Sequence, residues 1–177
     1  MNPAQSVVIR TYRGDADGTY RCFRAAIIGT ASADYDATQI AAWAGPSTSP
    51  GTLGDADLEA WDAKRRSAHT FLAVVDGTIA GFSDFRDDAV LDMLFVRPEF
   101  GGRGVARQLV ETVQREAVAA GFTSLTTFAS RTARPAFERL GFTVVAERPD
   151  NTVRGVVVPN YAMRWDRWPG STSSRTA

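Results

Sequence analysis

The order of strand-like and helix-like segments predicts a single α/β domain, with a mixed sheet covered by helices on both faces. The chain has 177 residues, which suits one well-buried domain. Asp76-Gly77 separates two runs rich in β-branched and aromatic residues, the signature of a hairpin. A short apolar strand at 89–96 ends before Pro98. An amphipathic helix at 103–120 links it to a further strand, so these two strands are expected to be parallel.

The N-terminal third is expected to form one strand and then three helices. The first segment mixes β-branched and aromatic residues, as strands do. Apolar residues then recur at helical spacing, and Asp36 or Thr38 can cap the second helix. The expected elements are a strand at 7–12 and helices at 19–30, 36–44 and 55–67, with a Gly/Pro/Ser-rich loop at 45–54.

The C-terminal third is expected to alternate between strands and one short helix. Gly121 and Gly141 each follow a segment with helical spacing, where a glycine commonly ends a helix. The expected elements are strands at 124–130, 142–147 and 152–165 and a helix at 132–140. The domain is expected to span residues 1–168, and the polar tail at 169–177 to be disordered.

The composition excludes several classes of protein. The hydrophobic share is 44% and the charged share 23%, and 20 acidic residues balance 20 basic ones. A neutral chain has no bulk electrostatic attraction to nucleic acid or to an anionic membrane, so neither is expected as a partner. A single cysteine, Cys22, and a single histidine, His69, predict no internal disulfide and no metal site. The chain shows neither a signal peptide nor a transmembrane run, so the expected location is the cytoplasm.

Residues 96–110, VRPEFGGRGVARQLV, place three glycines at the start of an expected helix. A helix begins with four N–H groups that lack an internal partner and with the positive end of its dipole. Gly101, Gly102 and Gly104 lack a Cβ, so their loop can bring backbone amides close to a phosphate. A tight turn without a ligand is the alternative that the glycines alone leave open. The spacing matches neither a P-loop nor a dinucleotide-binding fingerprint.

The stretch LFVRPEFGGRGVARQLV, residues 94–110, resembles the acetyl-CoA-binding motif of the GCN5-related N-acetyltransferase (GNAT) superfamily. In that motif a strand ends in V-x-P and is followed by [QR]-x-x-G-x-[GA] and an amphipathic helix. Gly104 and Ala106 match the final glycine and small residue, whereas Gly101 replaces the usual Gln or Arg. ARPAFERLGF, residues 133–142, is similar to a second helix motif of the superfamily, and VVDGTIAGF is similar to its central hairpin.

The resemblance covers roughly residues 7–166 and implies the acyl-CoA N-acyltransferase fold. That fold has a mixed, mostly antiparallel sheet of about seven strands with a central splay. The implied activity is transfer of an acetyl group from acetyl-CoA to a primary amine by direct attack in a ternary complex. The sequence does not decide between a small-molecule amine and a peptide as the acceptor. It also leaves open transfer to oxygen instead of nitrogen, a longer acyl group on the donor, and the formation of a homodimer. The alternative is a non-catalytic acyl-CoA sensor or assembly module.

The resemblance also assigns residues to acetyl-CoA. Backbone groups of the strand beside the splay would bind the pantetheine arm, and an amide near Phe95 or Val96 would stabilise the tetrahedral intermediate. Ser130 stands where many relatives carry an asparagine, although its hydroxyl can equally cap the following helix. The implied cofactor-binding residues are Leu94, Phe95, Val96, Gly101, Gly102, Arg103, Gly104, Val105, Ala106, Ser130 and Phe137.

Two residues are candidates for proton transfer. Asp92 interrupts an otherwise apolar strand, where an unpaired charge is costly, so it is either the general base or the partner of a nearby arginine; Asp84 is the reserve. Phe137 occupies the position of the tyrosine that protonates the leaving thiolate in many relatives, and a phenyl ring cannot donate. Tyr161 is the candidate replacement, with an ordinary role in the sheet as the alternative.

Three aromatic residues between the first and second strands are candidates for the acceptor wall. The resemblance places this segment beside the acceptor cleft, and an aromatic lining suits an amine with an apolar or flat body. Packing in the core is the alternative for all of them. They are Tyr35, Trp43 and Trp61.

Overall fold

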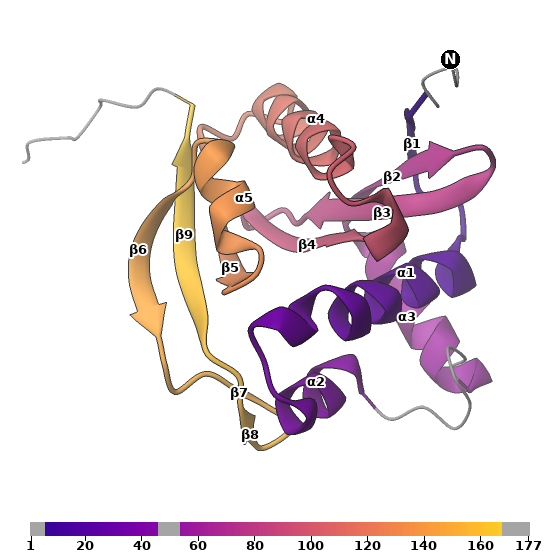
Figure 1. The fold of residues 1–177 in the computed structure, drawn as a ribbon. Coiled ribbons are helices and arrows are strands. Elements are labelled where there is room, and N and C mark those ends of the chain that lie inside the picture. Colours follow the sequence, from indigo (N-terminus) through magenta and orange to yellow (C-terminus); the bar gives the residue numbers. More distant parts are fainter. Residues whose placement is uncertain (1–5, 46–53, 168–177) are drawn as a thin grey trace, which may run out of the picture.

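The computed structural model describes residues 6–45 and 54–167, which form one α/β fold around a seven-stranded sheet (Figure 1). The strand order β1-β2-β3-β4-β5-β9-β6 confirms the expected mixed sheet. Residues 46–53 of the expected loop and the whole expected C-terminal tail at 169–177 lie outside the described residues. The sheet strands are β1 (Val8–Thr11), β2 (His69–Val75), β3 (Thr78–Phe85), β4 (Val90–Val96), β5 (Ser124–Ser130), β9 (Asn160–Asp166) and β6 (Thr143–Arg148).

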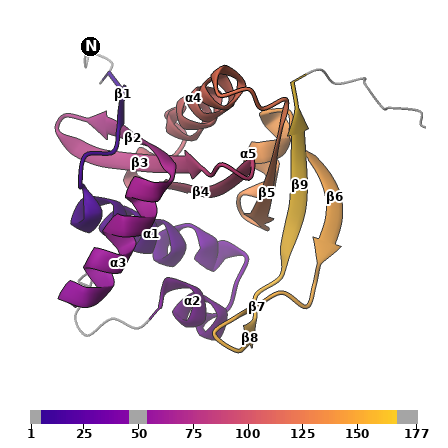
Figure 2. The ribbon, with the colours of Figure 1, turned by 180° about the vertical axis from the view of Figure 1, so that it is seen from behind.

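Helices cover both faces of the sheet, as Figure 1 and the reverse view in Figure 2 show. The helices are α1 (Ala16–Gly29), α2 (Ala37–Ala44), α3 (Asp55–Ser67), α4 (Val105–Ala119) and α5 (Arg134–Arg139), with short 3-10 turns η1 (Ala31–Ala33) and η2 (Pro98–Phe100). One core lies under α4 and α5, and a second lies under α1, where Tyr20, Cys22 and Phe23 pack against Leu72 and Phe82 of the sheet. The sheet is therefore buried on both faces around β2 and β3.

Local sequence signals account for several boundaries. Asp36 caps α2 in a capping box, because its carboxylate accepts from the Gln39 amide while the Gln39 side chain accepts from the Asp36 amide. Asp76 and Gly77 have φ values of 47° and 77°, so the hairpin between β2 and β3 turns through the left-handed region that the Asp-Gly signal predicts. The expected hairpin is confirmed.

The expectation of one strand at 152–165 is wrong. The structure contains a two-stranded hairpin, β7 (Thr152–Val153) and β8 (Val156–Val157), and only then the long strand β9. The cause is a second tight turn, since Arg154 has a φ of 47° and Gly155 a φ of 78°. Pro159 then separates the hairpin from β9. This hairpin lies beside α2 in both views (Figures 1 and 2).

The sheet splays between β4 and β5. These strands are parallel, as expected, but they pair only at Val90–Thr126 and Leu91–Thr127. Beyond Leu91, β4 continues to pair with β3 as far as Val96, while β5 pairs only with β9, its partner along its whole length. A gap bordered by unpaired β4 backbone therefore opens in the middle of the sheet.

Gly81 on β3 permits the close packing of α4 against the sheet. A Cβ at this position would lie 2.9 Å from the Phe95 carbonyl oxygen and 3.1 Å from side-chain atoms of Val105 and Leu109. Hydrogen is the only side chain that fits without moving β4 or the first two turns of α4. Gly81 thus fixes the position of the α4 N-terminus relative to the splay.

We expect Gly81→Ala to lower the free energy of unfolding by about 1–3 kcal/mol, because the added methyl group overpacks this contact. The control is Gly54→Ala, where the new Cβ would meet no atom within 4 Å; because Gly54 is the N-cap of α3, a position that disfavours alanine, the expected loss is below about 1 kcal/mol. Urea unfolding of the two variants measures the difference. Equal stability of the two variants would contradict the packing argument.

Candidate active site

A β-bulge at Asp92 marks the start of the splay. Asp84 of β3 pairs with Met93 of β4 and Phe85 pairs with Leu91, so Asp92 is the extra residue that has no partner in the register. Such a bulge bends its strand and redirects a side chain, and bulges are common beside active sites. The extra residue is the carboxylate that sequence reasoning selected as the candidate base.

Two side chains of β3 hold the bulge through the backbone of Met93. The Ser83 hydroxyl donates to the Met93 carbonyl at 2.7 Å, and the Met93 amide donates to the Asp84 carboxylate at 3.1 Å. Ser83 and Asp84 are both fully buried. Because a buried peptide group needs a partner, these two bonds favour the bulged register over a regular ladder.

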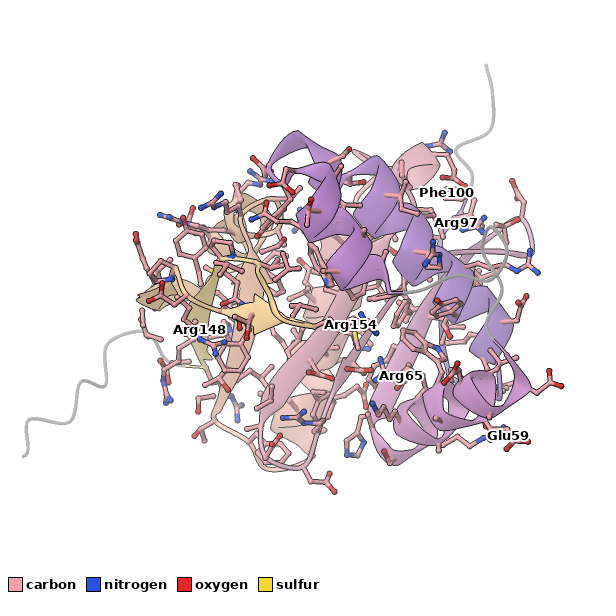
Figure 3. All side chains as sticks on the ribbon, turned by 90° about the horizontal axis from the view of Figure 1, so that it is seen from below. Glu59, Arg65, Arg97, Phe100, Arg148 and Arg154 are labelled. Carbon is pink, nitrogen blue, oxygen red and sulfur yellow. The ribbon has the colours of Figure 1, made fainter. Side chains whose placement is uncertain are left out.

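Arg65 joins the bulge to helix α3. Its guanidinium is 3.0 Å from the Asp84 carboxylate and 4.0 Å from that of Asp92, and it lies 5.0 Å from the centre of the Trp61 ring. Its side chain is only 3% exposed. It points toward the sheet, whereas Glu59 on the same helix points outward (Figure 3). Sequence reasoning missed Arg65, although it follows Trp61 by four residues and so shares its helix face.

A second arginine also contacts Asp92. Arg86 lies 3.6 Å from the Asp92 carboxylate and 2.9 Å from Asp88, on the exposed turn after β3. The Asp92 side chain is 34% exposed, so this pairing is open to solvent and weak. Asp92 therefore has the arginine neighbours that one interpretation of the sequence expected, and it still faces the cavity described below.

Burial raises the pKa of the Asp84 carboxyl to about 6; the positive charge of Arg65 opposes the rise and the negative charge of Asp92 adds to it. The folded-state pKa thus exceeds the unfolded value of 3.8. This carboxyl consequently contributes stability that is fully present below about pH 4 and is lost as the pH rises through about 6. Above that pH, the ionised carboxylate depends on Arg65 for compensation.

A first cavity lies in the splay, between β4, α1 and the start of α5. It has a volume of about 160 Å³ and a mostly apolar lining. Its lining includes the expected residues Leu94, Phe95, Val96, Ala106 and Ser130. The cavity therefore extends from the unpaired edge of β4 to the N-terminus of α4.

The backbone of β4 presents alternate amides to this cavity. Arg97 N donates to the Ala80 carbonyl, and Met93 N donates to the Asp84 carboxylate. From Met93 onward, the backbone amides of the odd-numbered residues therefore point toward β3. Alternation along a strand turns the amides of Leu94 and Val96 toward the splay. Those amides are free to bind an extended ligand as an added strand would.

The glycine-rich loop precedes the α4 N-terminus, whose first turn carries the cavity-lining Ala106. Gly102 and Gly104 have φ values of 71° and 76°, in the left-handed region that favours glycine. A Cβ on either one would meet no atom within 4 Å, so the loop faces open space. Gly101 differs from the expectation, because its amide already donates to the Pro98 carbonyl within the loop. Arg103 lies 5.5 Å from the centre of the Phe100 ring.

The open loop and the unpaired β4 edge fit a phosphate-bearing ligand with an extended arm. Gly104 precedes Val105, where α4 begins, so the first-turn amides of α4 point out of the helix at the loop. Val105 itself is buried in the core and positions the helix. These groups could hold the pyrophosphate and pantetheine of CoA.

A second cavity, of about 300 Å³, adjoins the first at the bulge. Phe95, Trp43 and Ser130 line both cavities. The full lining of the second cavity is Phe23, Tyr35, Trp43, Asp92, Met93, Phe95, Phe128, Ser130, Asn151, Val153, Val158 and Asn160. Two ligands, one in each cavity, would meet beside Phe95 and Ser130.

Ser130 and Tyr35 fix the end of β5 at this junction. The Ser130 hydroxyl accepts from the Ala133 amide at 3.0 Å, so it caps the turn before α5, and it keeps a proton to donate. The Tyr35 hydroxyl donates to the Pro159 carbonyl at 2.6 Å and accepts from the Arg131 amide at 2.9 Å. The Tyr35 hydroxyl thus already donates and accepts a hydrogen bond within the protein, and the Tyr35 ring forms part of the wall of the second cavity.

Three expected residues lie away from the two cavities. Phe137 is buried against Phe142, with ring centres 5.0 Å apart. Tyr161 packs against the core under α4 and α5, with the Arg134 guanidinium 4.6 Å from its ring centre. Neither side chain lines a cavity. Trp61 donates to the Thr19 hydroxyl at 2.9 Å and packs beside Phe23, behind the acceptor wall.

Cys22 contributes no nucleophile to the site. It is fully buried on α1, and burial raises the pKa of its thiol to about 12. In residues 6–45 and 54–167, no group of three His, Cys, Asp or Glu side chains is arranged to hold a metal ion. Within the same ranges no helix combines the length and the apolar character needed to cross a membrane.

Comparisons with known proteins define the family. Residues 32–165 match the model of the acetyltransferase (GNAT) domain. The chain belongs to the GNAT acetyltransferase family, and its structure is the GNAT fold. It is 33% identical over 161 residues to the uncharacterised N-acetyltransferase YafP of Escherichia coli K12, covering 90% of this chain and 96% of that protein.

Solved structures resemble the chain over nearly its whole length. A GCN5-related N-acetyltransferase from Rhodopseudomonas palustris matches with a TM-score of 0.81 and 26% identity, over 94% of this chain and 99% of that one. The PaiA N-acetyltransferase from Thermoplasma acidophilum, solved in complex with coenzyme A, matches with a TM-score of 0.68 and 17% identity, over 91% and 99%. The second likeness concerns the fold alone.

We expect the Arg65–Asp84 pair to show strong coupling in a double-mutant cycle. At a pH well above 6, Arg65→Met leaves a buried carboxylate without its counter-charge and should cost about 3–5 kcal/mol. Asp84→Asn keeps an acceptor for Met93 N but leaves Arg65 with only the more distant Asp92 carboxylate, at 4.0 Å. The double variant should lose at least about 1 kcal/mol less than the sum of the single losses.

The control is the exposed pair of Arg21 and Asp17, where Arg21→Met should change stability by less than about 1 kcal/mol. Chemical denaturation gives all four free energies of unfolding. Additive losses at Arg65 and Asp84 would show that the two side chains do not act as a buried ion pair.

Proposed function

We propose that the protein is an N-acetyltransferase that moves the acetyl group of acetyl-CoA to a primary amine by direct attack in a ternary complex. The observation that carries this proposal is the meeting of two cavities at the splay. The first is lined by the unpaired edge of β4 and by Ala106 in the first turn of α4, directly after the open glycine loop, and the second presents the Asp92 carboxylate. The family membership and the CoA complex of the Thermoplasma relative support acetyl-CoA as the donor.

The residues of the first cavity would bind CoA along its length. The loop amides and the α4 N-terminus would hold the pyrophosphate, and the Leu94 and Val96 backbone would hold the pantetheine arm. Bound acetyl-CoA supplies a thioester carbonyl that an amine can attack. The Leu94 or Val96 amide then donates to the oxygen that becomes negative during attack, since both face the splay.

Asp92 would prepare the amine. An amine arrives largely as an ammonium ion, and it must lose a proton before its nitrogen lone pair can attack. The bulge directs the Asp92 carboxylate into the second cavity, which is the proposed acceptor cavity. There the carboxylate can attract the ammonium ion and take its proton directly or through one water. Arg65 and Asp84 position it, because they anchor the backbone next to it.

The leaving thiolate would receive its proton from water or from the Ser130 hydroxyl. Phe137 cannot donate a proton, and the Tyr161 side chain does not line either cavity, which favours another donor. Ser130 lines both cavities and retains its proton. A thiolate is moderately basic and can leave without a strong acid.

Phe137 is also the observation that favours a second function, a non-catalytic acyl-CoA sensor. Such a protein would bind acetyl-CoA but release no free CoA in the presence of any amine. A thiol assay over a broad amine panel separates the two functions, and the mass of the product separates acetyl transfer to nitrogen from transfer to oxygen or of a longer acyl group.

We expect CoA and acetyl-CoA to stabilise the protein, by about 2.7 kcal/mol at one hundred times Kd. Gly104→Ala should weaken this binding about tenfold, because a side chain at a left-handed φ strains the loop that faces the phosphates. Gly121→Ala is the matched control: its φ is 93°, its Cβ would also meet open space, and it lies at the other end of α4. Thermal unfolding with and without ligand measures the binding. Absence of any shift at millimolar ligand would refute the proposal.

We expect Asp92→Asn to lower kcat about 10²–10⁴-fold while CoA affinity stays unchanged, because the amide cannot accept the ammonium proton. Asp88→Asn is the control, since Asp88 shares Arg86 with Asp92 but stands outside the cavity lining. Steady-state rates from thiol release decide the matter. A variant with a normal kcat would show that Asp92 is only an ion-pair partner.

A further inference from the structure

The acceptor cavity is a box of aromatic rings. Phe23 and Phe95 pack edge to face with ring centres 4.8 Å apart, and Tyr35 and Trp43 do so at 5.6 Å. Trp43 also contacts Phe95, with ring centres 6.2 Å apart. These rings pack against one another, and the Tyr35 hydroxyl both donates and accepts a hydrogen bond. The walls of the cavity are therefore preformed. Such a surface gains most from a flat apolar ligand.

The lining offers a single charge. Of the lining residues, Asp92 carries a formal charge, while Ser130, Asn151 and Asn160 are neutral polar residues. The amides of Asn151 and Asn160 are engaged in part, since Asn151 donates to the Val158 carbonyl at 2.8 Å and Asn160 accepts from Arg148 at 3.5 Å. One carboxylate compensates one ammonium group. A second cation in the same ligand would be buried without a partner, which is costly.

The β7–β8 hairpin closes the side of the cavity next to α2. Gln39 of α2 donates to the Val157 carbonyl at 2.9 Å, and Arg154 donates to the Ala42 carbonyl at 2.6 Å. Arg154 thereby binds the C-terminal end of α2, where unpaired carbonyls favour a cation. Figure 3 labels Arg154, which reaches from the hairpin to the end of α2. Among the described residues, these contacts close the α2 side of the cavity to an extended polypeptide.

Phe128 on β5 provides an exposed apolar surface at the cavity. Its side chain is 53% exposed, which is unusual for a phenylalanine, and it lines the acceptor cavity. The Arg148 guanidinium lies 4.4 Å from the ring centre and covers part of it. A bound aromatic ring would bury the remaining face of Phe128.

We propose that the acceptor is a small primary amine with one positive charge and a flat apolar body, of the arylalkylamine class. This inference rests on the proposed function and adds the substrate class. The ammonium group lies at Asp92, beside the thioester, and the aromatic body lies between the ring walls and Phe128. Polyamines and lysine side chains of folded proteins are poor acceptors for this cavity.

The test compares four acceptors: 2-phenylethylamine, propylamine, spermidine and a short lysine-containing peptide. We expect kcat/KM for 2-phenylethylamine to exceed that for propylamine at least about tenfold, because one buried methylene alone changes specificity by about 10–200-fold. Spermidine and the peptide should fall below 2-phenylethylamine. CoA release and product mass give the rates and the acetylated atom.

Two variants connect the preference to the cavity. Phe128→Ala should lower kcat/KM for 2-phenylethylamine about tenfold and for propylamine less than about twofold, since only the aromatic acceptor reaches that ring. Val145→Ala is the matched control, because Val145 is 59% exposed on β6, which β9 separates from β5, and does not line the cavity. This control variant should leave both values unchanged.

The outcomes separate the two proposals. Faster transfer to spermidine or to the peptide overturns the substrate class and leaves the acetyltransferase function intact. An equal loss for both amines in Phe128→Ala also overturns it, because the variant would then act through the fold. No transfer to any of the four acceptors, despite acetyl-CoA binding, overturns the proposed function and the substrate class together.

Discussion

The site depends on two hydrogen bonds between buried side chains of β3 and the backbone of Met93 on β4. The Ser83 hydroxyl donates to the Met93 carbonyl, and the Asp84 carboxylate accepts from the Met93 amide. Together these bonds hold Asp92 outside the strand register. A regular ladder would satisfy the same backbone groups without side chains, so the sequence of β3 selects the bulge. Because the pairing of β4 with β5 ends one residue earlier, at Leu91, the bulge and the splay form one feature. The unpaired β4 edge and the direction of the Asp92 carboxylate both follow from it.

Burial of a charged group makes this arrangement expensive and specific. Asp84 is fully buried, and Arg65 from α3 supplies its counter-charge across 3.0 Å. Removing either partner leaves the other in a poorly solvated position, so the pair ties α3 to the central strands. The same guanidinium lies 4.0 Å from Asp92, which links the electrostatics of the acceptor cavity to the packing of a helix outside it. Function and stability thus share one set of contacts.

Sequence reasoning succeeded where the determining signal is local. The Asp-Gly turn is observed, and the helix expected at 103–120 is α4 (Val105–Ala119); both follow from patterns that a few adjacent residues express. It failed where the determinant lies on another element. Tyr161 pairs with buried Ala129 whereas its neighbour Asn160 pairs with Ser130, so the two point to opposite faces, and strand parity decides which one reaches the cavity. Arg65 belongs to a basic run, Lys64–Arg66, and only the packing of α3 on the sheet buries its side chain. The Arg154-Gly155 turn is a local signal that interrupts the expected single strand.

The most direct measurement of the central claim is a crystal structure of the protein with CoA. We expect the pantetheine arm in the splay, hydrogen bonded to the backbone of Leu94 and Val96, the pyrophosphate at the loop of residues 102–106, and the bulge at Asp92 intact with Met93 bound to Ser83 and Asp84. A regular β4 ladder in that complex, or CoA bound at another surface, would contradict the account.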